Sequence, residues 1–420
     1  MEFTAIKGFK DVLPDEIGLW QLIETRAKAL LDSFCFQEIR PPLIEKNEVF
    51  SRGIGQETDI VSKEMYCITD SKGAVITLRP EATASMVRAY IQHRLYLQRP
   101  VQKLYTIGPM FRHERPQKGR YRQFHQVDVE IFGDSGPRSD CEVIAVAYYL
   151  LQALGLNGLS LKLNSLGCRK CRPRFKKDLR EYLSDRADGL CADCRRRAVA
   201  NPLRVFDCKV EGCGKVVADA PAITDYLCGE CSEHFDGVQE LLSALDIKFF
   251  LDPSLVRGLD YYARTTFEIQ TDRLGAQNAV VGGGRYDGLV ELLGGPDHPA
   301  IGFAMGMERL VALLEENGPL EQPGPDLFVA SLGAEAEKIC FRLIQKLRTA
   351  GVRVEAEYQS RSLKAQMKRA GKVDASYVLI VGENELRAGK GVLKNMSDGS
   401  HVDIPLSDAE SMLAVAVGKK

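Results

Sequence analysis

The sequence predicts an α+β protein, in which an antiparallel sheet flanked by helices is followed by a separate α/β domain. Between residues 36 and 163, strand-like runs such as VITL and VQKLYTIG cluster together and do not alternate strictly with helices, which is typical of an antiparallel sheet. The proline-rich stretch 317–326 predicts a linker. Beyond it, the patterns of residues 326–420 alternate as β-α-β-α-β, which indicates a small α/β domain.

The totals favour a cytoplasmic protein of two or three domains. A chain of 420 residues is too long for one hydrophobic core. Its formal net charge of -1 gives no overall basic field, so any binding of nucleic acid must be local. The N-terminus lacks a basic region followed by an apolar run, and no stretch of about 18 apolar residues occurs. We therefore expect no signal peptide and no membrane span.

Periodicity predicts the individual elements in order. Apolar residues at helical spacing between 17 and 34 predict an amphipathic helix, and ATASMVRAYIQH, 82–93, predicts another. Strand patterns return at 247–253 and 265–271. The glycine-rich VVGGGRYDGL, 280–289, is interpreted as a turn, and MERLVALLEE, 307–316, as a helix.

One predicted strand, within residues 123–132, has a polar face that needs an explanation. Because strand side chains alternate, Val127, Val129 and Ile131 share one face, and Gln126, Asp128 and Glu130 share the other. A solvated face is the ordinary interpretation. Phe124 and Phe132 also lie on the polar face, however, and mixed aromatic and carboxylate character suits a ligand-binding cleft better.

Eight of the twelve cysteines lie between residues 168 and 231, within a basic stretch. In a reducing compartment, such pairs indicate a metal site more than disulfides. Spacing predicts one zinc set and a possible second set, although interleaved sets or ordinary thiols stay open. The first set is Cys168, Cys171, Cys191 and Cys194, and the second is Cys208, Cys213, Cys228 and Cys231.

The chain has neither a GxxxxGK[ST] motif nor GxGxxG, so a bound nucleotide would need arginine to hold its phosphates. Four segments carry a resemblance to a known family. FRHERPQKGRYRQFHQVDVEIFG, 111–133, resembles motif 2 of the class II aminoacyl-tRNA synthetases, and AIGFAMGMERLVALL, 300–314, resembles motif 3. VRGLDYYARTTFEI, 256–269, and LRPEATASMVR, 78–88, resemble signatures of the histidyl-tRNA synthetases.

The resemblance implies a set of ATP contacts. Arg112 would bind the α-phosphate, Glu114 would approach the adenine, Phe124 would stack on it, and Arg309 would bind the γ-phosphate. Mg²⁺ is expected on the phosphates. Arg115, Lys118, Arg120 and Arg122 of the motif 2 turn would contact ATP or the acceptor stem, or form a solvated loop.

The resemblance also implies the histidine contacts. Gln126, Glu81 and Thr83 would bind the α-amino end, and Glu130 with Tyr262 would bind the imidazole. Arg257 is the expected catalytic cation, unless it simply pairs with Asp260, and Arg112 is expected to share in catalysis. Tyr261 is either part of the pocket wall or part of the core.

Together these patterns predict four regions and a function. The regions are a catalytic core with motifs 1 and 2 (1–165), a cysteine-rich insertion (166–240), the rest of the core (241–320) and an anticodon-binding domain (326–420). The family implies a homodimer that activates L-histidine with ATP and charges a histidine-specific tRNA. The alternative is a histidine-sensing regulatory subunit of ATP phosphoribosyltransferase, which is expected to lack the last domain and the ATP-binding arginines.

Overall fold

The computed structural model divides into two compact units, Met1–Pro319 and Leu320–Lys420. It describes residues 3–55, 58–117, 119–274, 278–316, 318, 323–359 and 361–418. Lys118 of the motif 2 turn and half of the predicted linker lie outside these residues. In the described part of the chain, no helix has the length and apolar character that a membrane span requires.

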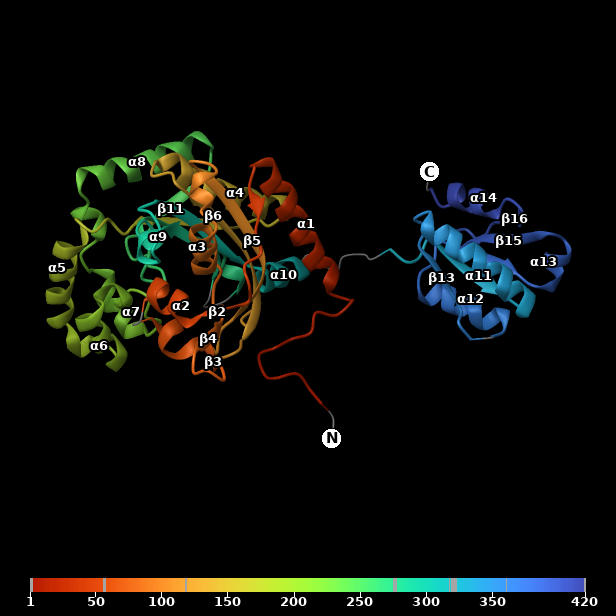
Figure 1. Ribbon diagram of the computed structural model, residues 1–420, viewed down its shortest axis with the longest axis horizontal. Helices are drawn as coiled ribbons and strands as arrows, with labels where there is room; N and C mark the ends of the chain where they lie inside the picture. The colour runs from red at the N-terminus through yellow and green to blue at the C-terminus, as the bar shows by residue number, and fades with distance from the viewer. Residues whose placement is uncertain are drawn as a thin grey trace. The chain divides into compact units, whose positions relative to one another are not determined.

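The first unit is built on an eight-stranded, mainly antiparallel sheet, as predicted (Figure 1). Only the outer pairs β1–β5 and β7–β8 run parallel. In spatial order the strands are β1 (Gln37–Glu38), β5 (Gln102–Phe111), β6 (Gln123–Phe132), β11 (Ala300–Gly306), β10 (Ala279–Arg285), β9 (Ala263–Gln270), β7 (Ser160–Ser165) and β8 (Phe249–Leu251).

Helices cover one face of this sheet and enclose the main core. These helices are α1 (Ile17–Ser33), α4 (Pro137–Ala153), α8 (Gly229–Ala244) and α10 (Met307–Glu315). Val127, Val129 and Ile131 of β6 are buried against them, which confirms the predicted alternation. Trp20 of α1 joins the same core, so the predicted N-terminal helix is also confirmed.

The opposite face of the sheet carries small residues, among them Gly282, Gly284 and Gly302, which we call the glycine floor. One prediction for this region is wrong. The glycine-rich run 280–289 begins as strand β10, paired between β9 and β11, and not as a turn. A Cβ at Gly282 would overlap the guanidinium of Arg257, and a Cβ at Gly302 of β11 would overlap the carboxylate of Glu130. The glycines therefore allow the side chains of Arg257 and Glu130 to approach the sheet closely. Such long-range contacts cannot be predicted from the local pattern, which favours a turn.

Smaller elements surround this face. A three-stranded sheet has the order β2-β4-β3, and helices α2, α3 and α9 pack near it or against the floor. Their bounds are β2 (Ile44–Lys46), α2 (Asn47–Ile54), β3 (Tyr66–Thr69), β4 (Val75–Leu78), α3 (Thr83–Gln92) and α9 (Leu289–Leu292). Helix α3 confirms the helix predicted at 82–93.

The cysteine-rich segment, residues 166–240, is mostly helical. Figure 1 shows α5, α6 and α7 grouped at one side of the first unit, and α8 contacts α4 of the main core. The bounds are α5 (Arg172–Ser184), α6 (Ala192–Ala200) and α7 (Glu211–Ala218). Helices α5 to α7 enclose a small core of their own, which includes Phe175, Leu179, Cys194 and Cys213.

The second unit is a five-stranded sheet with helices, in the order β13-β12-β14-β15-β16. Its first five elements confirm the predicted β-α-β-α-β alternation, and β15 with β16 adds an antiparallel hairpin that was not predicted. The bounds are β12 (Leu327–Ser331), α11 (Ala334–Thr349), β13 (Val354–Ala356), α12 (Leu363–Lys372), β14 (Tyr377–Val381), α13 (Glu383–Arg387), β15 (Lys390–Asn395), β16 (His401–Pro405) and α14 (Ala409–Ala416).

Candidate active site

The carboxylate of Glu130 lies at one end of the glycine floor and accepts two hydroxyl hydrogen bonds. Thr83 Oγ1 donates to Oε1 at 2.7 Å, and Tyr286 OH donates to Oε2 at 2.6 Å. Burial raises the pKa of Glu130 well above its ordinary value, although these two hydrogen bonds lower it. Tyr286 was not foreseen; its signal in the sequence is a tyrosine directly after the last residue of β10.

Glu81 is placed beside Thr83 by the start of helix α3. Its Oε2 accepts the Thr83 amide at 2.8 Å, and its Oε1 accepts the Ala84 amide at 2.9 Å. Burial raises the pKa of Glu81. The carboxylate thus satisfies two free amides of the first turn and fixes the orientation of Thr83 toward Glu130.

Arg257 lies over the middle of the floor, against Gly282. Its guanidinium forms an ion pair with Glu268 of β9, and its carbon Cζ lies 5.9 Å from the ring centroid of Tyr262. Burial lowers the pKa of Arg257, but Glu268, Tyr262 and Tyr261 together more than offset this and the pKa lies above its ordinary value. The alternative pair with Asp260 is not formed, because Asp260 binds Arg204 at 2.7 Å instead.

Tyr261 and Tyr262 form an aromatic wall with Tyr286. The ring centroids are 4.7 Å apart for Tyr261 and Tyr262, and 5.6 Å apart for Tyr261 and Tyr286. Tyr261 packs on the cluster that contains Tyr286 and Phe132, so it contributes to both the wall and the core. Burial raises the pKa of both Tyr261 and Tyr262, which keeps their hydroxyls neutral as donors at neutral pH.

Three polar groups on this face are buried without a protein partner among the described residues. They are Gln126 Oε1, both carboxylate oxygens of Asp128, and Arg257 Nε. Burial is the largest cause, and repulsion from Glu81 the second largest, that raises the pKa of Asp128 well above its ordinary value. Buried polar groups are normally hydrogen-bonded, so donors and acceptors left open on one face indicate a polar ligand there.

Arg112 and Phe124 lie together at the other end of β6. Arg112 Nε donates to the Pro80 carbonyl at 2.8 Å, and its guanidinium lies 5.2 Å from the ring centroid of Phe124. Phe124 shares a strand face with Gln126 and Glu130, since strand residues two apart point the same way. The predicted adenine end and imidazole end therefore lie along one strand.

Arg309, on helix α10, is brought to the same end as Arg112. One Nη of Arg309 donates to the carbonyl of Ala279. Burial and the nearby Arg120 lower the pKa of Arg309 to about 10. Arg120 pairs with Glu114 at 2.9 Å. Crowded arginines repel one another, and an anion such as a phosphate would relieve that repulsion.

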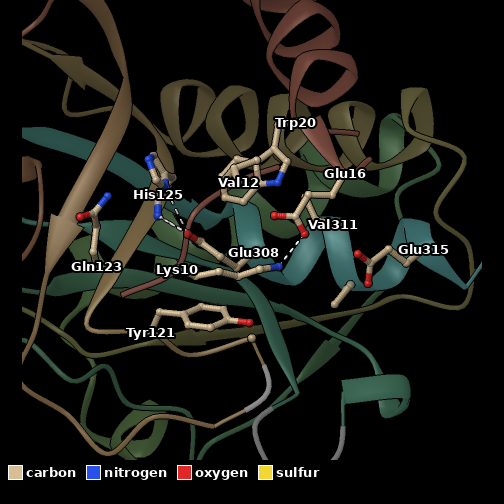
Figure 2. A pocket seen from close by; sticks show the side chains of 12 residues that line it. Lys10, Val12, Glu16, Trp20, Tyr121, Gln123, His125, Glu308, Val311 and Glu315 are labelled. Atoms are coloured by element: carbon tan, nitrogen blue, oxygen red, sulfur yellow. Dashed lines mark hydrogen bonds and ion pairs between the residues drawn. The ribbon is translucent and has the colours of Figure 1, made fainter. Parts of the chain in front are cut away.

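A small cavity on the helix-covered side shows how the two motifs are joined (Figure 2). Glu308 of α10 accepts the backbone amide of His125 at 2.8 Å and faces its ring Nδ1 at 3.1 Å. Trp20 packs edge-on against the His125 ring, with centroids 5.0 Å apart. Because His125 follows Phe124 directly, these contacts fix helix α10 relative to β6. Neither His125 nor Glu308 was singled out from the sequence.

The eight cysteines form two groups, but in a partition that differs from the predicted one. Cys168 and Cys171 meet Cys228 and Cys231, whereas Cys191 and Cys194 meet Cys208 and Cys213. We call these the outer and inner tetrads. In each tetrad the four sulfurs lie within 4.8 Å of one another. The sets are therefore nested, because the helical segment folds back on itself, and spacing along the chain does not record that path.

Comparisons with known proteins agree with this geometry. The family described as "Histidyl-tRNA synthetase" matches residues 8–310, and "Anticodon binding domain" matches residues 326–415. A histidine–tRNA ligase of Desulfosudis oleivorans is 54% identical over 413 residues, 97% of each chain. One of Desulfatibacillum aliphaticivorans is 52% identical over 414 residues, 99% of each chain.

A solved structure supports the same assignment. The crystal structure of apo histidyl-tRNA synthetase of S. aureus has a TM-score of 0.83 and 34% identity to this chain, and the likeness covers 98% of this chain and 100% of that one. The fold and the family implied by the four sequence motifs are confirmed. The chain therefore belongs to the histidyl-tRNA synthetase family of class II aminoacyl-tRNA synthetases.

Proposed function

We propose that the protein is a histidine–tRNA ligase whose site lies on the glycine floor, with the residues in the roles that the resemblance implies. The carboxylate of histidine attacks the α-phosphorus of ATP, pyrophosphate leaves, and histidyl-adenylate forms. A terminal hydroxyl of the tRNA then attacks the histidyl carbonyl, and AMP leaves. The observation that carries the proposal is the linear series Phe124, Gln126, Asp128 and Glu130 on one face of β6, half-buried at Phe124 and Gln126 and buried at Asp128 and Glu130.

The cations of the site suit the first step. Negative charge develops on the α-phosphoryl oxygens during the attack, and fixed guanidinium groups stabilise it without reorganisation. Arg257 lies against Gly282, and Arg112 is held by the Pro80 carbonyl, so both are preorganised. Arg309 takes the γ-phosphate, whose negative charge would reduce the repulsion between Arg309 and the nearby Arg120 and Arg112.

Selectivity for histidine follows from the carboxylate of Glu130, which the hydroxyls of Thr83 and Tyr286 hold in place. Glu130, with Tyr262 beside it, offers an acceptor and a donor to the two imidazole nitrogens, while Gln126, Glu81 and Thr83 take the α-amino end. An amino acid without these ring nitrogens would leave buried groups unpaired, which is a strong means of rejection.

The regulatory-subunit alternative is not supported. Such a subunit is expected to lack the anticodon-binding domain, which is present at 326–415. It is also expected to have lost the ATP-binding arginines, whereas Arg112 and Arg309 converge at one end of β6.

The remaining partners are inferred on coarser grounds. Mg²⁺ would be bound chiefly by the phosphates. The two carboxylates near Arg309 belong to Glu114 and Glu268, and each is already paired with an arginine, so we assign no protein ligand to Mg²⁺. We assign structural Zn²⁺ to the cysteine tetrads. Free thiols favour a cytoplasmic location. A homodimer would cover exposed apolar residues of the small sheet, such as Ile44 and Ile68.

Histidine-dependent exchange of labelled pyrophosphate into ATP tests the proposal. We expect exchange with pure protein and histidine, no exchange with other amino acids, and charging of total tRNA in the same preparation. Absence of exchange with pure, folded protein would refute the ligase assignment.

A further inference from the structure

We infer that the two cysteine tetrads each bind one Zn²⁺ and that these ions hold the active-site loop 252–262 in place. The inference rests on the proposed ligase function, because that loop carries Arg257 and Tyr262. It adds a role for the cysteine-rich segment: support of histidine binding and adenylate formation, before any tRNA is bound.

Each tetrad has dimensions that suit a single tetrahedral ion. Zn–S bonds of about 2.3 Å place the sulfurs about 3.8 Å apart. In the outer tetrad Cys168 Sγ lies 3.6 Å from Cys171 Sγ and 3.9 Å from Cys228 Sγ. In the inner tetrad Cys191 Sγ lies 4.0 Å from Cys208 Sγ. These distances are too long for disulfides, and a maximum of 4.8 Å leaves no room for a multi-iron cluster.

Backbone amides also point at the sulfurs, as expected for thiolates. The amide of Cys228 donates to Cys171 Sγ at 3.2 Å, and the amide of Cys191 donates to Cys213 Sγ at 3.2 Å. The Lys170 amide donates to Cys168 Sγ at 3.3 Å. Such hydrogen bonds stabilise negative charge on sulfur, the form that binds metal.

The tetrads add to the small hydrophobic core of the cysteine-rich segment. The core enclosed by α5 to α7 is small, and two of its buried members, Cys194 and Cys213, belong to the inner tetrad. The outer tetrad joins the residues that follow β7 to the start of α8, so it closes the base of the segment. Ligation would therefore supply folding energy to this region.

Arg172, which directly follows the outer ligand Cys171, contacts the active-site loop. Its Nε donates to the Leu166 carbonyl at 3.0 Å, and one Nη donates to the carbonyl of Tyr262. Tyr262 is one of the residues that form the wall of the histidine pocket. The position of the outer tetrad thus determines the position of a donor that holds this tyrosine.

Arg204 makes the second connection, from a turn between the inner ligands Cys194 and Cys208. It pairs with Asp260 at 2.7 Å and donates to the Arg257 carbonyl at 3.3 Å. Asn201 adds a hydrogen bond to Asp260 at 3.1 Å. The loop between β8 and β9 is therefore held at residues 257, 260 and 262 by side chains of the metal-binding segment.

Metal analysis and one matched pair of variants test the inference. We expect two zinc equivalents per chain in protein purified without chelator. Arg172→Met should retain both zinc ions yet raise the histidine KM in pyrophosphate exchange by about tenfold, because a charged donor to two carbonyls is lost. Lys177 lies on the exposed side of the same helix, α5, so Lys177→Met should change neither the zinc content nor the histidine KM.

Metal removal supplies the second arm. Chelation should raise the histidine KM without tRNA present, and added Zn²⁺ should restore it. Cys208→Ser should lower the zinc content to about one, whereas Cys35→Ser, outside both tetrads, should leave two. Less than one zinc in active wild-type protein, or an unchanged KM in Arg172→Met, would overturn the inference. A wild-type protein with two zinc ions and no exchange would instead refute the ligase function.

Discussion

Two groups of buried polar side chains, one on each face of the large sheet, differ in how completely they are hydrogen-bonded. On the helix-covered face, Arg285 pairs with Asp140 at 2.5 Å, and His234 of α8 contacts the other carboxylate oxygen at 2.7 Å. Arg285 also donates to Ser139 and to backbone carbonyls of residues 134 and 136. On the opposite face, Asp128 is buried and Gln126 is half-buried, and the Asp128 carboxylate oxygens and Gln126 Oε1 have no hydrogen-bond partner among the described residues.

This difference separates stabilisation from function. A completed buried network fixes the position of β10 relative to α4 and α8, whereas an incomplete one costs free energy unless a ligand completes it. The same sheet therefore places rigid support directly behind the face that, in our proposal, binds histidine and ATP. Variants on the two faces should therefore have separable effects on stability and on catalysis.

The largest loss of stability should come from the completed network. Burial opposes ionisation of Asp140, but Arg285 and His234 keep its pKa below the ordinary value. Asp140→Asn removes the closer of the two carboxylates that pair with Arg285 and leaves only Asp287, at 3.2 Å, so the free energy of unfolding should fall by about 3 kcal/mol. Fluorescence of Trp20, the single tryptophan and part of this core, reports the urea transition.

Glu142→Gln, on the same helix, is the control. Glu142 pairs with Lys103 in a partly exposed position, where ion pairs contribute about 0 to 1 kcal/mol. Equal effects of the two substitutions would show that the buried network has no special stabilising role.

On the ligand face, Arg257→Lys should reduce catalysis much more than stability. Lysine retains one charge but loses the planar guanidinium that contacts Glu268 and, in our proposal, the reacting groups. The rate of adenylate formation in a single turnover should fall by about 100-fold or more. Arg273, which forms a partly exposed ion pair with Glu316, supplies the control: Arg273→Lys should leave this rate near normal. A normal rate in Arg257→Lys would exclude Arg257 from catalysis.

Glu130→Gln should affect recognition selectively. The amide keeps the shape but loses the charge that accepts from Thr83, Tyr286 and histidine. Charge-assisted hydrogen bonds contribute about 1.5 to 3 kcal/mol, so the histidine KM should rise about tenfold to a hundredfold, with little change in the KM for ATP. Tyr286→Phe should give a smaller rise in the same direction. Similar small changes in both KM values would indicate a purely structural Glu130.

The sequence predicted these two faces unequally. Alternation in residues 126–131 was sufficient to separate the core face from the polar face, because a period of two is a local property of the chain. The strand at 279–285 was missed because three successive glycines favour a turn locally, and only the approach of Arg257 and Glu130 explains them. The partition of the cysteines and the contact of Tyr286 with Glu130 depend on long-range topology, which spacing does not contain.

The smallest expected effect tests the incomplete network directly. Asp128 has a raised pKa, so the folded state binds its proton more tightly than the unfolded state does, and ionisation of Asp128 reduces stability. This loss begins as the pH rises above about 3.9, the unfolded value, and is complete once the pH exceeds the raised folded pKa. Asp128→Asn removes the loss, so the free energy of unfolding at neutral pH should increase by about 1 kcal/mol, and the difference from wild type should vanish toward pH 3.9 and below. Because a negative charge beside the predicted ammonium position is removed, the histidine KM should rise a few-fold in the same variant. Urea unfolding followed through Trp20 at several pH values, together with the exchange assay, measures both quantities. Lower stability of Asp128→Asn at neutral pH would show that the Asp128 carboxylate is already stabilised by the protein and that this face does not depend on a ligand to complete it.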